Sequence, residues 1–382
     1  MDLAGEAFDR ADASRTDVMK IQIPSEPRGI ALIMVMIIVV VFGMLAAGFA
    51  YSMKVEIQLA RNSNRDTEME WMGRSGIELA KYVLASSANK GVDSLKDKWA
   101  GGPGDTNDPA SAVQMENRPL GSGTITVKIT DCNSKININN INPANVEILR
   151  QALILIGVDA AETPKICNGI LDWLDPDDST QIGSTETESD YYLTLNPPYR
   201  AKDGPIDDLT ELLLIHYITP AMYWGSHSEG AQYHQRPGMT PRGQRWEMPS
   251  YPVGFVDLFT PFGAGGMNIN TAPPNVLQLI PEVDGIIAQA IIAFRNGPDG
   301  VPGTEDDVPL NIGMLASIPG IPPMPPQAMQ NFSRLSGSRS TAFEVKVDVQ
   351  IDQVTRTYYS VLARGVGRDL QPLFMYWKDG KN

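Results

Sequence analysis

Two acidic segments of the chain carry side-chain oxygens of the kind that a hard divalent cation requires. In the first segment, oxygen-bearing side chains fall at positions 1, 3, 5, 7 and 12 of a twelve-residue count: Asp175, Asp177, Ser179, Gln181 and Glu186. Calcium loops of the EF-hand type use this spacing. The sixth position, which that turn requires as glycine, is Thr180, so a true EF-hand is not expected. A solvated acidic loop that caps a helix is the alternative interpretation.

The second acidic segment, residues 296–307, combines glycines with carboxylates. Glycine lets the backbone curl tightly, so that carbonyl and carboxylate oxygens can converge on a calcium ion. The carboxylates concerned belong to Asp299, Glu305, Asp306 and Asp307. We expect calcium here too, and an ordinary turn-rich linker is the alternative.

Patterns that would indicate catalysis are weak. The three histidines, His216, His227 and His234, form no His-Glu-x-x-His pair, the arrangement that binds zinc on one helix face. Residues 226–230 read Ser-His-Ser-Glu-Gly and lack the first glycine of a Gly-x-Ser-x-Gly nucleophile elbow. We therefore expect no enzymatic activity, and we interpret His227 and His234 as surface-loop residues.

The elements that must position these segments begin with an anchor. Ile30–Met53 is a run of 24 residues without a charged side chain. As a helix it would reach about 36 Å, enough to cross a hydrocarbon core of roughly 30 Å. A buried soluble helix and a cleaved secretory signal are the alternatives, but a signal should be shorter and end in a small-residue cleavage motif. We predict a transmembrane helix at 30–53 and an amphipathic continuation over 54–88.

Strand patterns occur in two distant places. Residues 124–129 alternate polar with β-branched side chains, and residues 343–351 and 355–362 do the same around a turn at Asp352-Gln353. Most of the roughly 200 residues between them have helical patterns. We predict an α+β fold in which a small antiparallel sheet domain, residues 89–135 and 336–382, contains an inserted α domain, residues 136–335.

The insert contains a weak repeat. Residues 136–149 and 268–279 both place Asn-Ile-Asn before a proline and a helical pattern, where Asn or Thr can cap a helix. These units resemble helix-hairpin-helix modules, which bind DNA phosphates through a glycine-rich hairpin. The hairpins at 157–159 and 281–285 carry acidic side chains instead, and the formal charge of -14 repels nucleic acid. We interpret the units as packing elements and expect no nucleic-acid partner.

The junction Pro27-Arg28-Gly29, followed by Ile30, resembles the N-terminus of prepilin-like proteins. In that class a peptidase cuts after a glycine that precedes an apolar helix, and it methylates the new N-terminus. The resemblance implies cleavage between Gly29 and Ile30 and makes residues 1–29 a leader. This leader is long and acidic, and a start at Met19 would make it an ordinary short one.

Most prepilin-like proteins have Glu at the fifth mature position, and here that position is Met34. In the class this Glu is held to meet the amino group of the subunit ahead, whereas a subunit at the tip has none ahead. The K-type minor pseudopilins of type II secretion, the general secretion pathway protein K family, lack this Glu. The chain resembles that family through further segments in the same order: 131–139, 170–177, 186–192, 208–212 and 268–272.

This resemblance implies a pilin-like, single-pass protein of the bacterial inner membrane with most of the chain in the periplasm. It implies a place at the tip of the type II secretion pseudopilus, where the protein would assist pseudopilus assembly and protein export across the outer membrane. The partners implied are the other minor pseudopilins, the major pseudopilin and the prepilin peptidase, with the secreted substrate or the outer-membrane secretin as further candidates. A type IV pilus minor pilin and a membrane-tethered DNA-uptake receptor are the alternatives.

The same resemblance implies calcium in the first acidic segment, with Glu188 and Asp190 as further ligands. Cys132 and Cys167 are the only cysteines, so the fold is no disulfide scaffold. They could form a single bridge outside the cytoplasm, and two buried free thiols fit the sequence equally well.

Overall fold

The computed structural model describes residues 28–87, 91–176, 188–225, 251–322, 325–365 and 370–379 of the 382-residue chain. The chain divides into two compact units, Met1–Asn64 and Arg65–Asn382. Helix α1, Arg28–Ser87, contributes to both units.

In the first unit, α1 is an apolar helix whose side chains are exposed. Within the described residues, one helix is long and apolar enough to cross a membrane, and it covers Ile30–Ser86 with a mean hydropathy of 3.1 in its most apolar window. None of that window is buried. The predicted N-terminal apolar helix is therefore confirmed, and its exposed surface is consistent with a single-pass membrane anchor.

In the second unit, α1 packs on a β-sheet. Its apolar side chains recur at spacings of three and four, and the buried ones include Met69, Met72, Ala80, Val83 and Leu84. Gly73 and Gly76 lie on the same face: an added Cβ would come within 2.6 Å of the Tyr358 ring and 2.5 Å of Val347. The two glycines therefore allow the helix backbone to approach the sheet closely.

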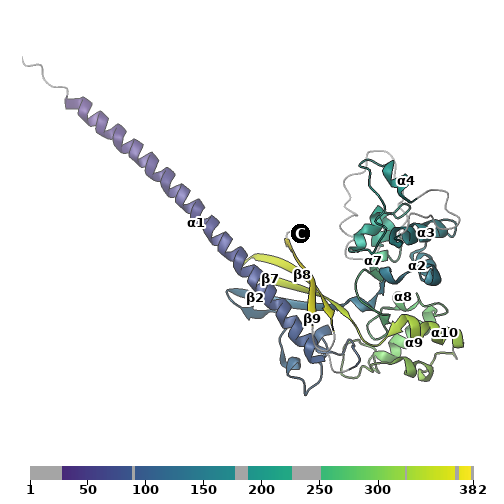
Figure 1. Ribbon diagram of the computed structural model, residues 1–382. Helices are drawn as coiled ribbons and strands as arrows, with labels where there is room; N and C mark the ends of the chain where they lie inside the picture. Colours follow the sequence, from purple (N-terminus) through teal and green to yellow (C-terminus); the bar gives the residue numbers. More distant parts are fainter. Residues whose placement is uncertain are drawn as a thin grey trace, which may run out of the picture. The chain divides into compact units, whose positions relative to one another are not determined.

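The sheet has five antiparallel strands in the order β1-β2-β7-β8-β9 (Figure 1). Their bounds are β1 Arg118–Leu120, β2 Gly123–Asp131, β7 Ala342–Ile351, β8 Val354–Arg364 and β9 Leu370–Asp379. The three predicted strands correspond to β2, β7 and β8, and β7 and β8 turn at Asp352 and Gln353 as predicted. Asp352 has a positive φ of 54°, a conformation that Asp tolerates better than most residues. The sequence patterns missed β1 and β9.

The residues between β2 and β7 form a largely helical insert, so the predicted mixed α+β class is confirmed. Its α-helices are α2 Glu147–Ile156, α3 Thr163–Leu174, α4 Glu188–Leu193, α5 Pro220–Trp224, α7 Phe255–Leu258, α8 Pro274–Leu277, α9 Gly285–Arg295 and α10 Pro326–Leu335. Two short parallel pairs join β3 Ile136–Asn137 to β4 Phe259–Thr260, and β5 Met267–Asn268 to β6 Ser336–Gly337.

Short 3-10 helices complete the described elements. They are η1 Lys98–Ala100, η2 Pro109–Ala112, η3 Cys132–Ser134, η4 Ile138–Asn140, η5 Pro143–Asn145, η6 Leu209–Leu214 and η7 Ile312–Ser317.

The insert and the sheet have separate hydrophobic cores. The insert core draws on α2, α3, α8 and α9 through Leu149, Leu153, Ile166, Ile170, Leu277 and Ile291. The sheet core is formed by α1 and the inward side chains of β2 and β7. Each part therefore has its own apolar burial, the main favourable contribution to folding.

The repeated Asn-Ile-Asn units differ in how their helices begin. Asn142 caps η5 as expected, because its Oδ1 accepts a 3.0 Å bond from the Ala144 N–H and Pro143 follows it. In the second unit the cap position of α8 is Pro273, without a side-chain bond. Thr271 does not cap this helix, because its hydroxyl donates to the buried carboxylate of Asp131 at 2.5 Å.

Candidate functional site

The first acidic segment is described only in part. Asp175 follows α3 as its C-cap residue, and its N–H donates to the Leu171 carbonyl at 2.9 Å. Asp177 and Glu186 lie outside the described residues, while Glu188 and Asp190 belong to α4. Calcium binding by this segment stays a prediction.

The second acidic segment is a closed loop between α9 and η7. The Val308 N–H donates to the Arg295 carbonyl at 2.8 Å and joins the two ends of the loop. Gly297, Gly300 and Gly303 all have positive φ angles, of 69°, 69° and 83°. The loop therefore curls through its glycines, as the sequence predicted.

The carboxylates of this loop accept hydrogen bonds from the loop itself. Asp306 accepts from the Thr304 hydroxyl at 2.6 Å and from the Asp299 N–H at 3.1 Å, and the bond from Thr304 lowers the pKa of Asp306. Asp307 accepts from the Gly303 N–H at 2.7 Å. Within the described parts of the chain, no three His, Cys, Asp or Glu side chains converge in a geometry that could hold a metal.

The donor chemistry of the loop nevertheless suits a hard cation. Its oxygens are carboxylates, the Thr304 hydroxyl and backbone carbonyls, which are the ligand types that calcium prefers. At the base of the loop the Asn296 Oδ1 is buried and has no hydrogen-bond partner among the described residues, and Asn296 lines a small cavity together with the buried Asp307. An unpartnered buried oxygen is unfavourable, and a cation is one group that would satisfy it.

The two cysteines are buried and free. Cys132 packs with Ala342 and Val361 at the end of the sheet, whereas Cys167 lies in the insert core. Burial raises the pKa of Cys167 to about 11 and raises the pKa of Cys132 still further above its usual range. Thiols with raised pKa values are poor nucleophiles, so the structure has two inert thiols, the second of the alternatives that the sequence left open.

A buried polar cluster joins the insert to the sheet, and no sequence pattern had singled it out as a site. Asp131, the last residue of β2, is only 4% exposed. Its Oδ2 accepts from the Ser340 hydroxyl at 2.6 Å, close to the start of β7, and from the Thr271 hydroxyl at 2.5 Å, in the insert. Burial raises the pKa of Asp131 to about 6.

A second buried carboxylate completes this junction cluster, which we define as Asp93, Asp131, Asn268, Thr271, Ser340 and Arg364. Asp93 forms an ion pair with Arg364 at the end of β8, with 2.6 Å between Nη1 and Oδ2. The Asn268 amide donates to the Asp93 carbonyl at 3.0 Å and to the Ser340 hydroxyl at 2.8 Å. Buried polar groups that satisfy one another in this way fix a single arrangement of the elements that carry them.

The junction cluster holds the insert where the chain enters and leaves it. The chain leaves the sheet after Asp131 and returns to it just after Ser340. Asn133, two residues after Asp131, accepts at Oδ1 from the Thr341 N–H at 2.9 Å. This bond directly links the segment that enters the insert to the segment that leaves it. The segments 131–139 and 268–272, which the sequence analysis did not single out as a contact, therefore supply hydrogen bonds between the two parts.

The hairpin that precedes α9 directs an acidic side chain at the N-terminus of that helix. Asp284 caps α9, and its Oδ1 accepts from the Ile287 N–H at 2.9 Å. A phosphate at a helix N-terminus is bound by free backbone N–H groups. In α9 the Ile287 N–H is not free, because it donates to the Asp284 carboxylate. This cap agrees with the interpretation of α9 as a packing element, and for the other helices of the insert that interpretation stays a prediction.

Known proteins share both sequence and architecture with this chain. A family model described as type II secretion system (T2SS), protein K, matches residues 134–224. The type II secretion system protein K of Pseudomonas aeruginosa is 25% identical over 350 residues, 88% of this chain and 89% of the relative. The Klebsiella pneumoniae protein of the same name is 25% identical over 207 residues, 51% of this chain and 60% of the relative.

Solved structures show the same fold. The chain is similar to one in the crystal structure of the GspK-GspI-GspJ complex from the type 2 secretion system of enterotoxigenic Escherichia coli, with a TM-score of 0.61. The match has 17% sequence identity and covers 84% of this chain and 99% of that chain.

Proposed function

This chain belongs to the type II secretion system protein K family, and from that premise we propose that it is a minor pseudopilin at the tip of the pseudopilus. There it assists pseudopilus assembly and the export of proteins across the outer membrane. The observation that carries the tip assignment is Met34, which stands in an exposed apolar helix at the fifth position of the expected mature chain. A helix without a carboxylate at this depth has no need of a partner amino group above it.

The size of the head supports the same assignment. The insert lies between β2 and β7 and is held on the sheet by the junction cluster. A repeating shaft has to pack each subunit against the next, and we infer that a head enlarged by such an insert is too bulky for that position. At a tip no further subunit has to be accommodated above the head.

The partners that we propose follow from the family. The solved relative is in a complex with GspI and GspJ, and we propose that this chain assembles with corresponding minor pseudopilins. The major pseudopilin below them, the prepilin peptidase, and the secretin or the secreted substrate are further proposed partners. The chain would be a single-pass protein of the inner membrane with its bulk in the periplasm.

We further propose that calcium binds the loop 296–307 and the acidic segment after α3. In the loop, the carboxylates of Asp299, Asp306 and Asp307 and the unpartnered Asn296 Oδ1 would supply oxygen ligands. When bound, calcium would neutralise the mutual repulsion of these carboxylates and fix the loop conformation. The hydrogen bonds from Thr304 and Gly303 already hold two of the carboxylates toward the interior of the loop.

Co-purification tests the tip assignment. The full-length tagged chain would be expressed with the other minor pseudopilins of the same genome, extracted in mild detergent and purified through the tag. We expect a complex with fixed stoichiometry, and expression with the major pseudopilin alone should give a weaker association. Elution of the chain by itself would count against the assignment, and retention on DNA at moderate salt would favour the uptake-receptor alternative, which the family assignment does not favour.

Processing gives a second test. The prepilin peptidase should cut between Gly29 and Ile30 and leave a methylated isoleucine. N-terminal sequencing of protein purified from membranes would report this end directly. A mature protein that begins at Met1, at Met19 or beyond Ala50 would be incompatible with a prepilin-type anchor.

A further inference from the structure

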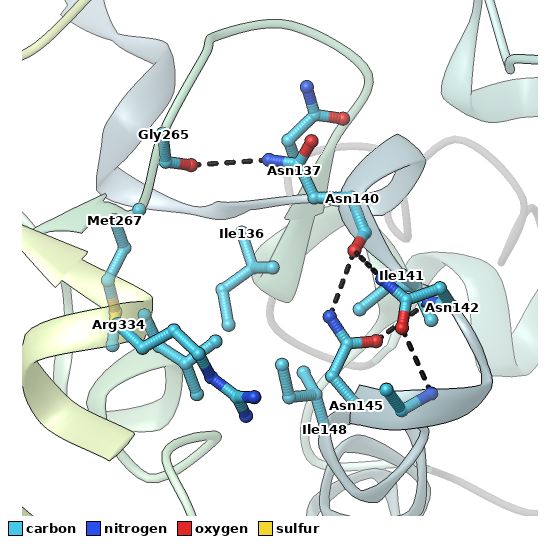
Figure 2. A pocket seen from close by; sticks show the side chains of 13 residues that line it. Ile136, Asn137, Asn140, Ile141, Asn142, Asn145, Ile148, Gly265, Met267 and Arg334 are labelled. Atoms are coloured by element: carbon cyan, nitrogen blue, oxygen red, sulfur yellow. Dashed lines mark hydrogen bonds between the residues drawn. The ribbon is translucent and has the colours of Figure 1, made fainter. Parts of the chain in front are cut away.

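A hollow of about 390 Å³ lies in the insert, between the first Asn-Ile-Asn unit and the end of α10 (Figure 2). Its apolar surface is formed by Ile136, Ile141, Ile148 and Met267, whose side chains are all largely buried. The carboxamides of asparagines such as Asn140 form part of the rim. A volume of this size is typical of ligand-binding clefts.

Among the described residues that line the hollow, Arg334 is the one with a charged side chain, and none carries a carboxylate. Arg334 is exposed, and within the described parts of the chain its guanidinium forms no hydrogen bond or ion pair. Figure 2 shows the guanidinium directed toward the middle of the hollow. A free cation in a lining without acids is complementary to an anion.

The rest of the lining restricts which anion fits. Inorganic phosphate would use the arginine but none of the apolar floor, and phosphate sites usually gather several donors. The floor of isoleucine and methionine is complementary to an aliphatic group. At the rim, the Asn140 amide donates to the Gly265 carbonyl at 3.2 Å. Its Oδ1 accepts no bond from the described residues, so it is an acceptor available to a peptide N–H.

We propose that this hollow binds an extended peptide segment of a partner protein in which an acidic side chain stands next to an aliphatic one. The carboxylate pairs with the Arg334 guanidinium, the aliphatic side chain covers the isoleucine floor, and a peptide N–H donates to the Asn140 Oδ1. The proposal goes beyond the pseudopilin assignment and does not depend on it.

A second hollow extends the site. It has a volume of about 520 Å³, lies along the exposed face of α10 beside Met329 and Ser333, and shares Arg334 with the first. Because Arg334 contributes to both hollows, a peptide bound to its guanidinium can continue in either direction from the carboxylate. This arrangement favours an extended segment over a free small acid.

The test compares two fluorescent peptides with blocked ends that differ by one group. One contains Leu-Asp-Leu and the other Leu-Asn-Leu, and each is titrated with the full-length protein in detergent while fluorescence anisotropy is measured. We expect the Asp peptide to bind at least about tenfold more tightly, as for a charge-assisted hydrogen bond, and to weaken as salt is raised. The formal charge of -14 repels anions, so non-specific binding would give the opposite order.

Substitutions of Arg334 test whether its guanidinium causes the preference for the Asp peptide. Arg334→Gln should abolish the preference for the Asp peptide, and Arg334→Lys should keep part of it. Arg200→Gln is the matched control, because it removes the same charge from an exposed arginine outside the lining. The proposal is overturned if the two peptides bind equally, if Arg334→Gln keeps the preference while circular dichroism is unchanged, or if acetate competes as well as the Asp peptide does.

Discussion

Arg364 and Asp93 form a two-pronged ion pair in the interior of the head. Nη1 lies 2.6 Å from Oδ2 and Nη2 lies 3.1 Å from Oδ1, and the two side chains are 3% and 2% exposed. The pair joins the last residue of β8 to the segment that follows α1, and Arg364 also donates to the Ser340 carbonyl at 2.9 Å. It thereby connects three stretches of chain at the place where the insert meets the sheet.

Loss of one partner of this pair should destabilise the head strongly. Arg364→Ala leaves the Asp93 carboxylate buried without its counter-ion, and removal of one member of a buried pair typically costs about 3–5 kcal/mol. Arg364→Lys keeps the charge but not the two-pronged geometry, so its unfolding free energy should lie between those of the wild type and Arg364→Ala. Chemical unfolding of the full-length protein in detergent measures the free energies.

The control for this prediction is the exposed pair of Arg150 and Glu147 on α2, 3.1 Å apart. Arg150→Ala should change the unfolding free energy by no more than about 0.5 kcal/mol, because exposed helix pairs contribute little. If Arg364→Ala and Arg150→Ala have the same small effect, the junction cluster is not a stability determinant.

The protonation of Asp131 should make stability depend on pH. Its pKa is raised from 3.8 to about 6, mainly because the carboxyl group is buried, with Asp93 nearby adding to the shift. A group whose pKa is raised on folding contributes stability below its unfolded value, and this contribution is lost as the pH rises through about 6. The advantage of the wild type over Asp131→Asn should therefore be larger at pH 4 than at pH 8.

The measurement is the unfolding free energy of both proteins across this range. The upper limit of the change is about 1.4 kcal/mol for each unit by which the pKa is shifted, and the hydrogen bonds from Ser340 and Thr271 oppose the shift. A difference that stays constant between pH 4 and pH 8, or that grows with pH, would contradict the raised pKa.

Close contact between α1 and the sheet should make Gly76→Ala destabilising. Its Cβ would come within 2.5 Å of Val347 Cγ1, and overpacking of this kind typically costs about 1–3 kcal/mol. Gly48→Ala in the same helix is the control, because nothing lies within 4 Å of its added Cβ. The control should be neutral or slightly stabilising, since Ala is the better helix former. Equal melting temperatures for the two variants would show that α1 does not pack as described.

Calcium should raise the melting temperature of the head. A ligand that binds only the native state adds about 2.7 kcal/mol of stability at one hundred times its dissociation constant. The full-length protein would be melted in excess calcium and in chelator. The joint variant Asp299→Ala and Asp306→Ala should reduce the shift through loop 296–307, and Asp175→Ala with Asp177→Ala should reduce it through the first segment.

Magnesium at the same concentration is the control, because it demands a smaller and more regular coordination shell. If the melting temperature is the same in calcium and in chelator, calcium binding is refuted at both places. A shift that both pairs of substitutions leave intact would assign the ion to other residues.

The elements that could be predicted from the sequence are those in which a single local pattern determines which side chains are buried. In β2 the inward positions Ile125, Val127 and Ile129 alternate with polar residues, and this period of two identifies a strand without any tertiary information. β1 has only three residues, too few for a period to be visible. The pattern of β9 is interrupted by Pro372, which faces Leu362 at the irregularity in its pairing with β8.

The junction cluster could not be predicted in the same way. Asp131 continues the inward alternation of β2, at a position where the pattern calls for an apolar side chain, and this was the available signal. Its partners Thr271 and Ser340 lie 140 and 209 positions away in the sequence. Only the tertiary fold shows that hydroxyl groups from such distant segments satisfy the carboxylate.

The substitution Met34→Glu distinguishes a tip subunit from a shaft subunit. In a shaft, a carboxylate at this position would meet the amino terminus of the subunit ahead, whereas at a tip it has no partner in the membrane. An unpaired acid costs roughly 2.5–3.5 kcal/mol at the centre of a bilayer on insertion scales, and less at Met34, the fifth residue of the apolar run that begins at Ile30. We therefore expect impaired pseudopilus initiation and reduced secretion, while the head stays folded because it lies outside the apolar segment.

Two matched variants separate this effect from a general intolerance of polar groups. Met34→Gln has nearly the same shape as the Glu variant without a charge, and Met36→Glu places the acid at nearly the same depth on another face of the exposed apolar helix. In a tip subunit both Glu variants should impair secretion to a similar extent, and Met34→Gln should do so less. In a shaft subunit only Met36→Glu should be harmful, because the acid at position 34 would find its partner. Normal secretion by Met34→Glu, with incorporation along the filament, would therefore exclude the tip assignment.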